Sequence, residues 1–78
     1  MKINPYASNM TVLETENNSI LFSYKTPVAA FISGLGVVRT SKKWSVTTSR
    51  HINKWLGTEF SGMECKEVDQ TILDNLVK

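Results

Sequence analysis

Turn-forming residues interrupt the first half of the chain at short intervals, and this spacing restricts the fold more than any other feature. The interruptions are Asn17 and Asn18, then Lys25, Thr26 and Pro27, then Gly34, Leu35 and Gly36. Asn and Gly tolerate positive φ, and Pro cannot donate a hydrogen bond within a strand ladder. The segments between them have the β-branched and aromatic composition of strands: residues 10–16, 19–24, 28–33 and 37–40. This pattern predicts two β-hairpins, with Pro27 at a strand start or bend.

The apolar residues in the second half of the chain change to a helical period. Three of them stand at i, i+3 and i+4: Ile52, Trp55 and Leu56. Gly57 follows directly and is typical of a position just past a helix end. A threonine hydroxyl can accept the unpaired N–H groups of a first turn, so Thr47 or Thr48 is the expected N-cap. The sequence therefore predicts a short central helix over residues 48–56.

The two ends of the chain are predicted to differ in order. Residues 1–9 contain Pro5 and no apolar period, so we expect a flexible N-terminal arm there. Residues 63–68 have the composition of a last strand, and Asp69 stands where it would cap a terminal helix. The apolar face of that helix would consist of Ile72, Leu73 and Leu76. The folded part is expected to be one small domain over residues 10–78.

The expected fold class is α+β. A chain of 78 residues buries only about 60% of its unfolded surface, which leaves room for one modest core. We expect a small antiparallel sheet of two β-hairpins, with about four or five strands, packed on one face against the short central helix and the C-terminal helix. The predicted core contacts join Ile52, Trp55 and Leu56 to Leu21 or Phe22, Phe31 and Val37. The other face of so small a sheet would stay partly open, which allows a homodimer without requiring one.

The charges are distributed unevenly along the chain. No acidic residue occurs between Asn17 and Thr58, and all seven Asp and Glu residues lie outside that segment. Six of the nine Lys and Arg residues lie within it: Lys25, Arg39, Lys42, Lys43, Arg50 and Lys54. The formal net charge of +2 therefore combines a +6 interior with acidic ends. A positive block with interleaved aromatic residues is typical of a surface that binds a polyanion.

One loop and one helix would bring most of these cations together. Two lysines are expected in the loop that enters the central helix, and three further residues share the polar face of that helix. The predicted binding residues are Arg39, Lys42, Lys43, Arg50, Asn53 and Lys54. The competing interpretation is that the cations only solvate one surface. Tryptophan can stack on a base or fill a core; we expect Trp55 in the core and keep both roles open for Trp44.

The chain offers little material for catalysis or metal binding. One cysteine, Cys65, and one histidine, His51, cannot form an internal disulfide or a tetrahedral zinc site in one chain. A nucleophilic pair of these two residues competes with structural roles for both, and the structural roles are favoured. The carboxylates lie near the termini without metal-binding spacing. We therefore expect no enzyme activity, no cofactor and no metal.

The sequence also predicts where the protein resides. The longest wholly apolar run, residues 28–32, is far shorter than the roughly 20 residues that span a bilayer. The first residues lack the apolar region of a secretory signal. A lone cysteine is typical of a reducing compartment, so we expect a cytosolic protein with no membrane partner.

Two stretches of the sequence form distinctive motifs. Residues 23–29 read SYKTPVA, and residues 43–55 read KWSVTTSRHINKW. Together they resemble a family of small uncharacterised proteins of tailed bacteriophages, over residues 20–56, which is about half of the chain. The resemblance implies a viral origin and expression in the host bacterial cytoplasm. It implies no activity, because no function is established for that family.

Three non-enzymatic functions follow from these features. The first is a phage accessory protein that binds nucleic acid through the basic loop and helix. The alternative is a protein-binding inhibitor of a host enzyme or antiviral defence complex, whose acidic or nucleic-acid-handling surface the basic face would occupy. The third is a small virion or assembly component. The expected partner is therefore nucleic acid or an intracellular host protein complex.

Overall fold

The chain folds into one β-sheet and two helices. A computed structural model describes residues 2–7 and 9–77, so residues 1, 8 and 78 lie outside the description. In chain order the elements are β1 (Lys2–Ala7), β2 (Met10–Glu14), β3 (Asn18–Ser23), β4 (Thr26–Ile32), β5 (Gly36–Thr40), α1 (Val46–Glu59), β6 (Cys65–Val68) and α2 (Gln70–Leu76).

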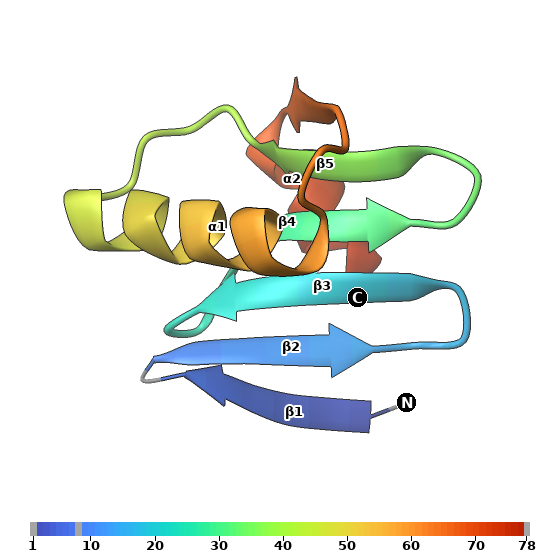
Figure 1. Ribbon diagram of the computed structural model, residues 1–78, viewed down its shortest axis with the longest axis horizontal. Helices are drawn as coiled ribbons and strands as arrows, with labels where there is room; N and C mark the ends of the chain where they lie inside the picture. Colours follow the sequence, from blue (N-terminus) through green and yellow to red (C-terminus); the bar gives the residue numbers. More distant parts are fainter. Residues whose placement is uncertain (1, 8, 78) are drawn as a thin grey trace.

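The strands lie in the sheet in the same order as in the sequence, from β1 to β6 (Figure 1). Neighbouring strands from β1 to β5 are antiparallel, whereas β5 and β6 are parallel. A parallel pair needs a crossover connection, and α1 provides it. The α+β class and both predicted hairpins, β2–β3 and β4–β5, are confirmed. The sheet of six strands is larger than expected, and the prediction of a wholly antiparallel sheet is wrong.

The segment expected to be a flexible arm is the edge strand of this sheet. Strand β1 pairs with β2 from Lys2 to Ala7. The prediction of a flexible arm over residues 1–9 is therefore wrong for Lys2–Ala7, and its statements about residues 1 and 8 fall outside the description. Pro5 lacks a backbone N–H, but an edge strand has a side that needs no ladder hydrogen bonds. The ordered domain consequently includes β1.

Helix α1 begins earlier than the sequence predicts. It starts at Val46 instead of at residue 48. The N-cap is Ser45, whose Oγ accepts a hydrogen bond from the N–H of Thr48 at 3.1 Å. The prediction of Thr47 or Thr48 as the cap is wrong, because the serine hydroxyl three residues before Thr48 already satisfies that N–H group.

Helix α1 also continues through Gly57 and ends at Glu59. The residue after it, Phe60, stacks on Phe31 with ring centroids 5.4 Å apart and meets the edge of Trp55 at 4.9 Å. These aromatic contacts place Phe60 against the core. The predicted role of Gly57 as the residue past the helix end is wrong, because tertiary packing outweighs its weak local preference.

The two helices cover opposite faces of the sheet (Figure 1). The α1 face holds one cluster of buried side chains: Met10, Val12, Leu21, Val28, Ala29, Ile52 and Trp55. The α2 face holds a second cluster: Ile20, Ala30, Val38 and Leu73. Side chains alternate along a strand, so Leu21 packs with Ile52 and Trp55 while Phe22 packs on the α2 side. The contacts of Ile52 and Trp55 with Leu21 are confirmed, and the prediction that both helices share one face is wrong.

The C-terminal elements follow the prediction closely. Strand β6 lies within the expected residues 63–68, and α2 follows it directly. Asp69 occupies the N-cap position of α2, but its side chain makes no capping hydrogen bond. Leu73 is buried, whereas Ile72 is 45% exposed and so does not belong to the buried face of α2. Within the described chain, neither helix has the length and apolar character that a membrane crossing requires.

Candidate functional site

The loop of residues 41–45 connects β5 to α1 and is anchored at both ends. The N–H of Ser41 donates to the carbonyl of Val68 at 2.8 Å, and the N–H of Lys42 donates to Thr40 Oγ1 at 3.1 Å. The last residue of the loop caps α1. Because β5 and β6 are parallel, their C-terminal ends lie at the same end of the sheet, and α1 starts there as well.

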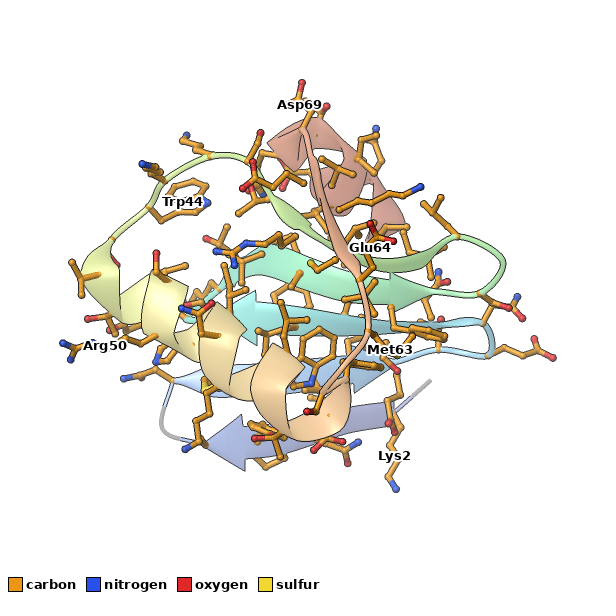
Figure 2. The ribbon with its side chains drawn as sticks, turned by 45° about the horizontal axis from the view of Figure 1, so that its top comes forward. Lys2, Trp44, Arg50, Met63, Glu64 and Asp69 are labelled. Carbon is orange, nitrogen blue, oxygen red and sulfur yellow. The ribbon has the colours of Figure 1, made fainter. Side chains whose placement is uncertain are left out.

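A pocket of about 620 Å³ lies between this loop, the end of β5 and the first turns of α1. It is lined by all but one of the predicted binding residues: Arg39, Lys42, Lys43, Arg50 and Asn53. The exception is Lys54, which is exposed on α1 but does not line the pocket. Lys54 stands about one helical turn beyond Arg50, roughly 6 Å farther from the loop along the axis. We call this site the basic pocket; Figure 2 shows Trp44 of the loop and Arg50 of α1 on the same side of the molecule.

The basic pocket carries a positive charge. Lys42, Lys43 and Arg50 are exposed, Arg39 is partly buried, and Glu67 of β6 is the acidic residue in the lining. These side chains have a formal charge of +3. Helix α1 has no acidic residue in its first turn, so its unpaired N–H groups add the positive end of the helix dipole. The site is therefore suited to an anionic ligand.

Arg39 is the innermost cation of the basic pocket. Its Nη1 donates to Asn53 Oδ1 at 3.3 Å, which joins β5 to α1. Its Nε is buried and has no hydrogen-bond partner in the part of the chain that the structure describes. A buried donor without a hydrogen-bond partner carries a free-energy cost in the folded state. Arg39 is thus fixed in position and retains an unused donor.

The two tryptophans occupy different environments. Trp55 is 2% exposed and belongs to the core, as predicted. Trp44 is 43% exposed and lines the basic pocket, and its Nε1 donates to Gln70 Oε1 at 3.1 Å. The sequence left its role open, and the signal that could have resolved it is its position between Lys43 and Ser45 in a polar loop.

His51 belongs to a chain of hydroxyl groups between α1 and β3. Its Nδ1 lies 2.7 Å from Ser23 Oγ, which in turn lies 3.1 Å from Thr48 Oγ1. Ser45 Oγ extends the chain and lies 3.3 Å from Thr48 Oγ1. Ser23 and Thr48 are buried, so these groups satisfy one another instead of facing a substrate. These hydrogen bonds fix the first turns of α1 on the sheet. The same turns form one wall of the basic pocket.

Cys65 is a free, partly buried thiol on β6. Burial raises its pKa above the ordinary value of a thiol, although the positive charge of Arg39 opposes this rise. A raised pKa reduces the thiolate fraction, which is the opposite of what a nucleophilic cysteine requires. With His51 bound to Ser23, the geometry supports structural roles for both residues. In the described ranges, no group of three or more His, Cys, Asp or Glu residues is placed to hold a metal ion.

An apolar hollow of about 320 Å³ lies on the α2 side of the sheet. Its lining consists of Ile3, Thr11, Leu13, Phe22, Tyr24 and Lys25, and we call it the apolar groove. Helix α2 contacts β4, so β1 and β2 are left largely uncovered on this side. Ile3 is 67% exposed and Tyr24 is 54% exposed. The sequence-based prediction missed the groove because it assigned Ile3 to a flexible arm. The available signal was that adjacent apolar residues, Val12 and Leu13, point to opposite faces of a strand, so that both faces carry apolar side chains.

Comparison with known proteins identifies a family but no characterised relative. Residues 1–74 match a family described as a family of unknown function (DUF8033). The search of curated proteins gave no match, and the search of solved structures gave none. The expectation of an uncharacterised family is confirmed, whereas this match carries no statement about a phage origin.

Proposed function

We propose that this chain, which belongs to the family of unknown function DUF8033, is a small non-enzymatic accessory protein that binds nucleic acid through the basic pocket. The observation that carries the proposal is the convergence of five polar residues on one pocket: Arg39, Lys42, Lys43, Arg50 and Asn53. They come from β5, from the loop and from α1, so the fold brings residues of three different segments to one pocket. Such convergence favours a binding surface over charges that merely solvate the protein.

The donors of the basic pocket suit phosphate groups. The guanidinium groups of Arg39 and Arg50 offer planar pairs of donors, and the lysines supply mobile point charges. The start of α1 adds backbone N–H groups that commonly bind phosphate. Contacts of this kind give affinity without reading the base sequence.

The contacts of Asn53 argue against a strong preference for base sequence. An asparagine side chain can read an adenine edge, but this requires a free amide oxygen and nitrogen together. In this protein the Oδ1 of Asn53 already accepts a hydrogen bond from Arg39. Its role in the proposal is to hold the guanidinium group in place.

The setting of this function is part of the proposal. The motifs at residues 23–29 and 43–55 resemble those of tailed-bacteriophage proteins, which supports a phage gene expressed in the host bacterial cytoplasm. The free Cys65 suits a reducing compartment. A nucleic-acid ligand would be abundant in that setting.

A salt titration with paired charge variants tests the proposal. Fluorescence anisotropy would give the affinity for labelled single-stranded and duplex DNA and RNA as the salt concentration rises. If the four cations of the pocket each meet one phosphate, the log-log slope should be about −3 for single strands and about −3.6 for duplex DNA. Lys43→Glu should weaken binding and reduce the slope by about one contact, because Lys43 lines the pocket.

Lys54→Glu is the matched control, because it changes the same charge on an exposed residue outside the pocket. We expect it to keep the wild-type salt slope. The proposal is overturned if the wild type binds no nucleic acid at low salt. It is equally overturned if the two variants reduce the slope to the same extent.

A second candidate is the binding of a host protein complex, and the apolar groove favours it. Exposed large apolar side chains such as Ile3 and Tyr24 are common at protein interfaces. A pull-down from nuclease-treated bacterial lysate separates the candidates. This function predicts a stoichiometric protein that the wild type and Lys43→Glu retain and that an Ile3→Asp, Tyr24→Asp variant loses. Loss of all captured material after nuclease treatment contradicts it.

A further inference from the structure

Trp44 is an exposed aromatic side chain in the lining of the basic pocket. Its exposure of 43% contrasts with the 2% exposure of Trp55 in the core. An indole is among the largest apolar groups that so small a domain could bury, so leaving it in solvent forgoes stability. An exposed aromatic ring beside a positive groove is characteristic of sites where nucleic-acid bases stack.

The ring of Trp44 is held in one orientation before any ligand arrives. Its Nε1 donates to Oε1 of Gln70, the first residue of α2, at 3.1 Å. Gln70 is itself fixed, because its Nε2 donates to the carbonyl of Pro27 at 2.7 Å and to Asp74 Oδ1 at 3.0 Å. The loop that bears Trp44 is anchored at both ends as well. A ring fixed in this way loses little conformational freedom when a ligand stacks on it.

The ammonium group of Lys42, an exposed side chain, lies over the Trp44 ring. Its Nζ lies 4.1 Å from the centroid of the Trp44 ring, and Lys42 is itself exposed. An exposed cation–π contact strengthens an equilibrium by about two- to fivefold, whereas stacking of a base strengthens binding by about 5- to 150-fold. A base should therefore displace the ammonium group from the ring. The released Lys42 is then free to contact a neighbouring phosphate.

We infer that the ligand of the basic pocket is single-stranded nucleic acid, with one base stacked on Trp44 and the flanking phosphates bound by Lys42, Lys43 and Arg50. The inference rests on the proposed function and specifies its partner. In a duplex the bases are already paired and stacked, so a duplex offers phosphates to the pocket but no free base to Trp44. The phosphate contacts alone give no reason to prefer a single strand. The preference comes from Trp44.

Two strands with the same number of phosphates separate stacking from phosphate binding. One is an oligothymidylate of about 12 nucleotides, and the other is an abasic deoxyribose-phosphate strand of the same length. Anisotropy of the labelled strands would give their affinities for the wild type, Trp44→Ala and Trp44→Phe. We expect the wild type to bind the oligothymidylate about 5- to 150-fold more tightly than the abasic strand. Trp44→Ala should remove this preference, and Trp44→Phe should keep part of it.

Tryptophan emission supplies a second measurement that does not depend on the alanine variant being folded. The chain has two tryptophans, and Trp44→Phe leaves only the buried Trp55 as an emitter. The oligothymidylate should quench the wild-type emission and leave that of Trp44→Phe unchanged, while the abasic strand should quench neither.

The possible failures of the two proposals are distinguishable. If the wild type binds neither strand at low salt, the proposed function fails and the stacking inference fails with it. A second possible result is that the wild type binds both strands equally, that Lys43→Glu weakens both, and that no quenching occurs. In that case nucleic-acid binding stands and stacking on Trp44 is overturned. An equal loss of affinity for both strands in Trp44→Ala also overturns the stacking inference.

Discussion

Replacing Gly57 with alanine should stabilise the protein. Gly57 lies inside α1 and is exposed, and a Cβ added to it would meet no atom within 4 Å. Its φ lies outside the left-handed region that favours glycine. Alanine is the better residue at such a position, because glycine loses more backbone entropy when the helix forms. A glycine just past a helix end would respond in the opposite direction, so the sign of the effect reports where α1 ends.

The expected gain in the free energy of unfolding is about 0.5–1 kcal/mol. In a domain of this size, that gain raises the Tm by about 2–8 °C. If Gly57 instead had the left-handed conformation, alanine would lower the free energy of unfolding by about 1–2 kcal/mol. The two cases therefore differ by more than the usual error of a careful unfolding measurement.

Urea unfolding followed by circular dichroism is the appropriate assay. Gly34→Ala is the matched control, because Gly34 has a φ of 86° and its added Cβ also meets no atom within 4 Å. We expect Gly57→Ala to shift the midpoint to higher urea and Gly34→Ala to shift it to lower urea, with equal slopes. A loss of stability in Gly57→Ala similar to that in Gly34→Ala would refute the helical position of Gly57.

Three further predictions concern the groups around the site and the core. Ser23→Ala should lower the free energy of unfolding by about 1–3 kcal/mol, because it removes the partner of His51 Nδ1 and one of the two hydroxyl partners of the buried Thr48; no change in urea unfolding would show that the hydroxyl chain does not stabilise the fold. Phe60→Ala should lower it by about 1.5–3 kcal/mol through lost contact with Phe31 and Trp55, and wild-type stability would contradict this. Cys65 should react with iodoacetamide more slowly in the folded protein than in urea at about pH 8, because its raised pKa keeps the thiolate fraction low. The Cys65 thiol ionises at a lower pH in the unfolded state than in the folded state. The free energy of unfolding should therefore fall above about pH 8.5, and Cys65→Ser should remove that fall. Equal alkylation rates in both states would count against the raised pKa.

The hairpins could be predicted because their turn chemistry is local. Gly34 and Gly36 adopt positive φ values of 86° and 105°, which glycine accepts without a steric penalty. Pro27 lies at the second position of β4, close to the strand start that its missing N–H suggested. Features of this kind depend on a few adjacent residues and are therefore visible in the sequence.

Strand β1 could not be predicted in the same way, because its order comes from pairing with β2. Nothing in the composition of residues 1–9 marks that partner. The end of α1 has a similar cause, since Phe60 packs on Phe31, a residue far away in the sequence. Long-range contacts decided both boundaries against the local preferences.

The placement of the helices depended on the direction of one strand. Because β6 runs parallel to β5, the crossover helix α1 lies on one face of the sheet. Helix α2 then follows β6 and packs on the other face, where Leu73 joins the cluster around Ile20. An apolar stripe on a helix indicates that one side is buried, but it does not indicate which face of the sheet buries it.

Much of the basic pocket was predictable from the acid-free segment. Lys42 and Lys43 lie in the expected loop, and Arg50 lies on the exposed face of α1 as the helical period requires. Lys54 shares that face but lies too far along α1 to line the pocket. The orientation of the Trp44 ring was not predictable, because it depends on a hydrogen bond to Gln70 at the start of α2.

Chemical-shift mapping of a nucleic-acid titration tests the basic pocket most directly. Isotope-labelled protein would be titrated with an oligothymidylate of about 12 nucleotides at low salt while amide and indole N–H signals are recorded. We expect the largest changes at Arg39, in residues 41–45 and in the first turns of α1, together with a shift of the Trp44 indole and a nearly unchanged Trp55 indole. Changes centred on the apolar groove instead, or no changes at all, would contradict binding through the basic pocket.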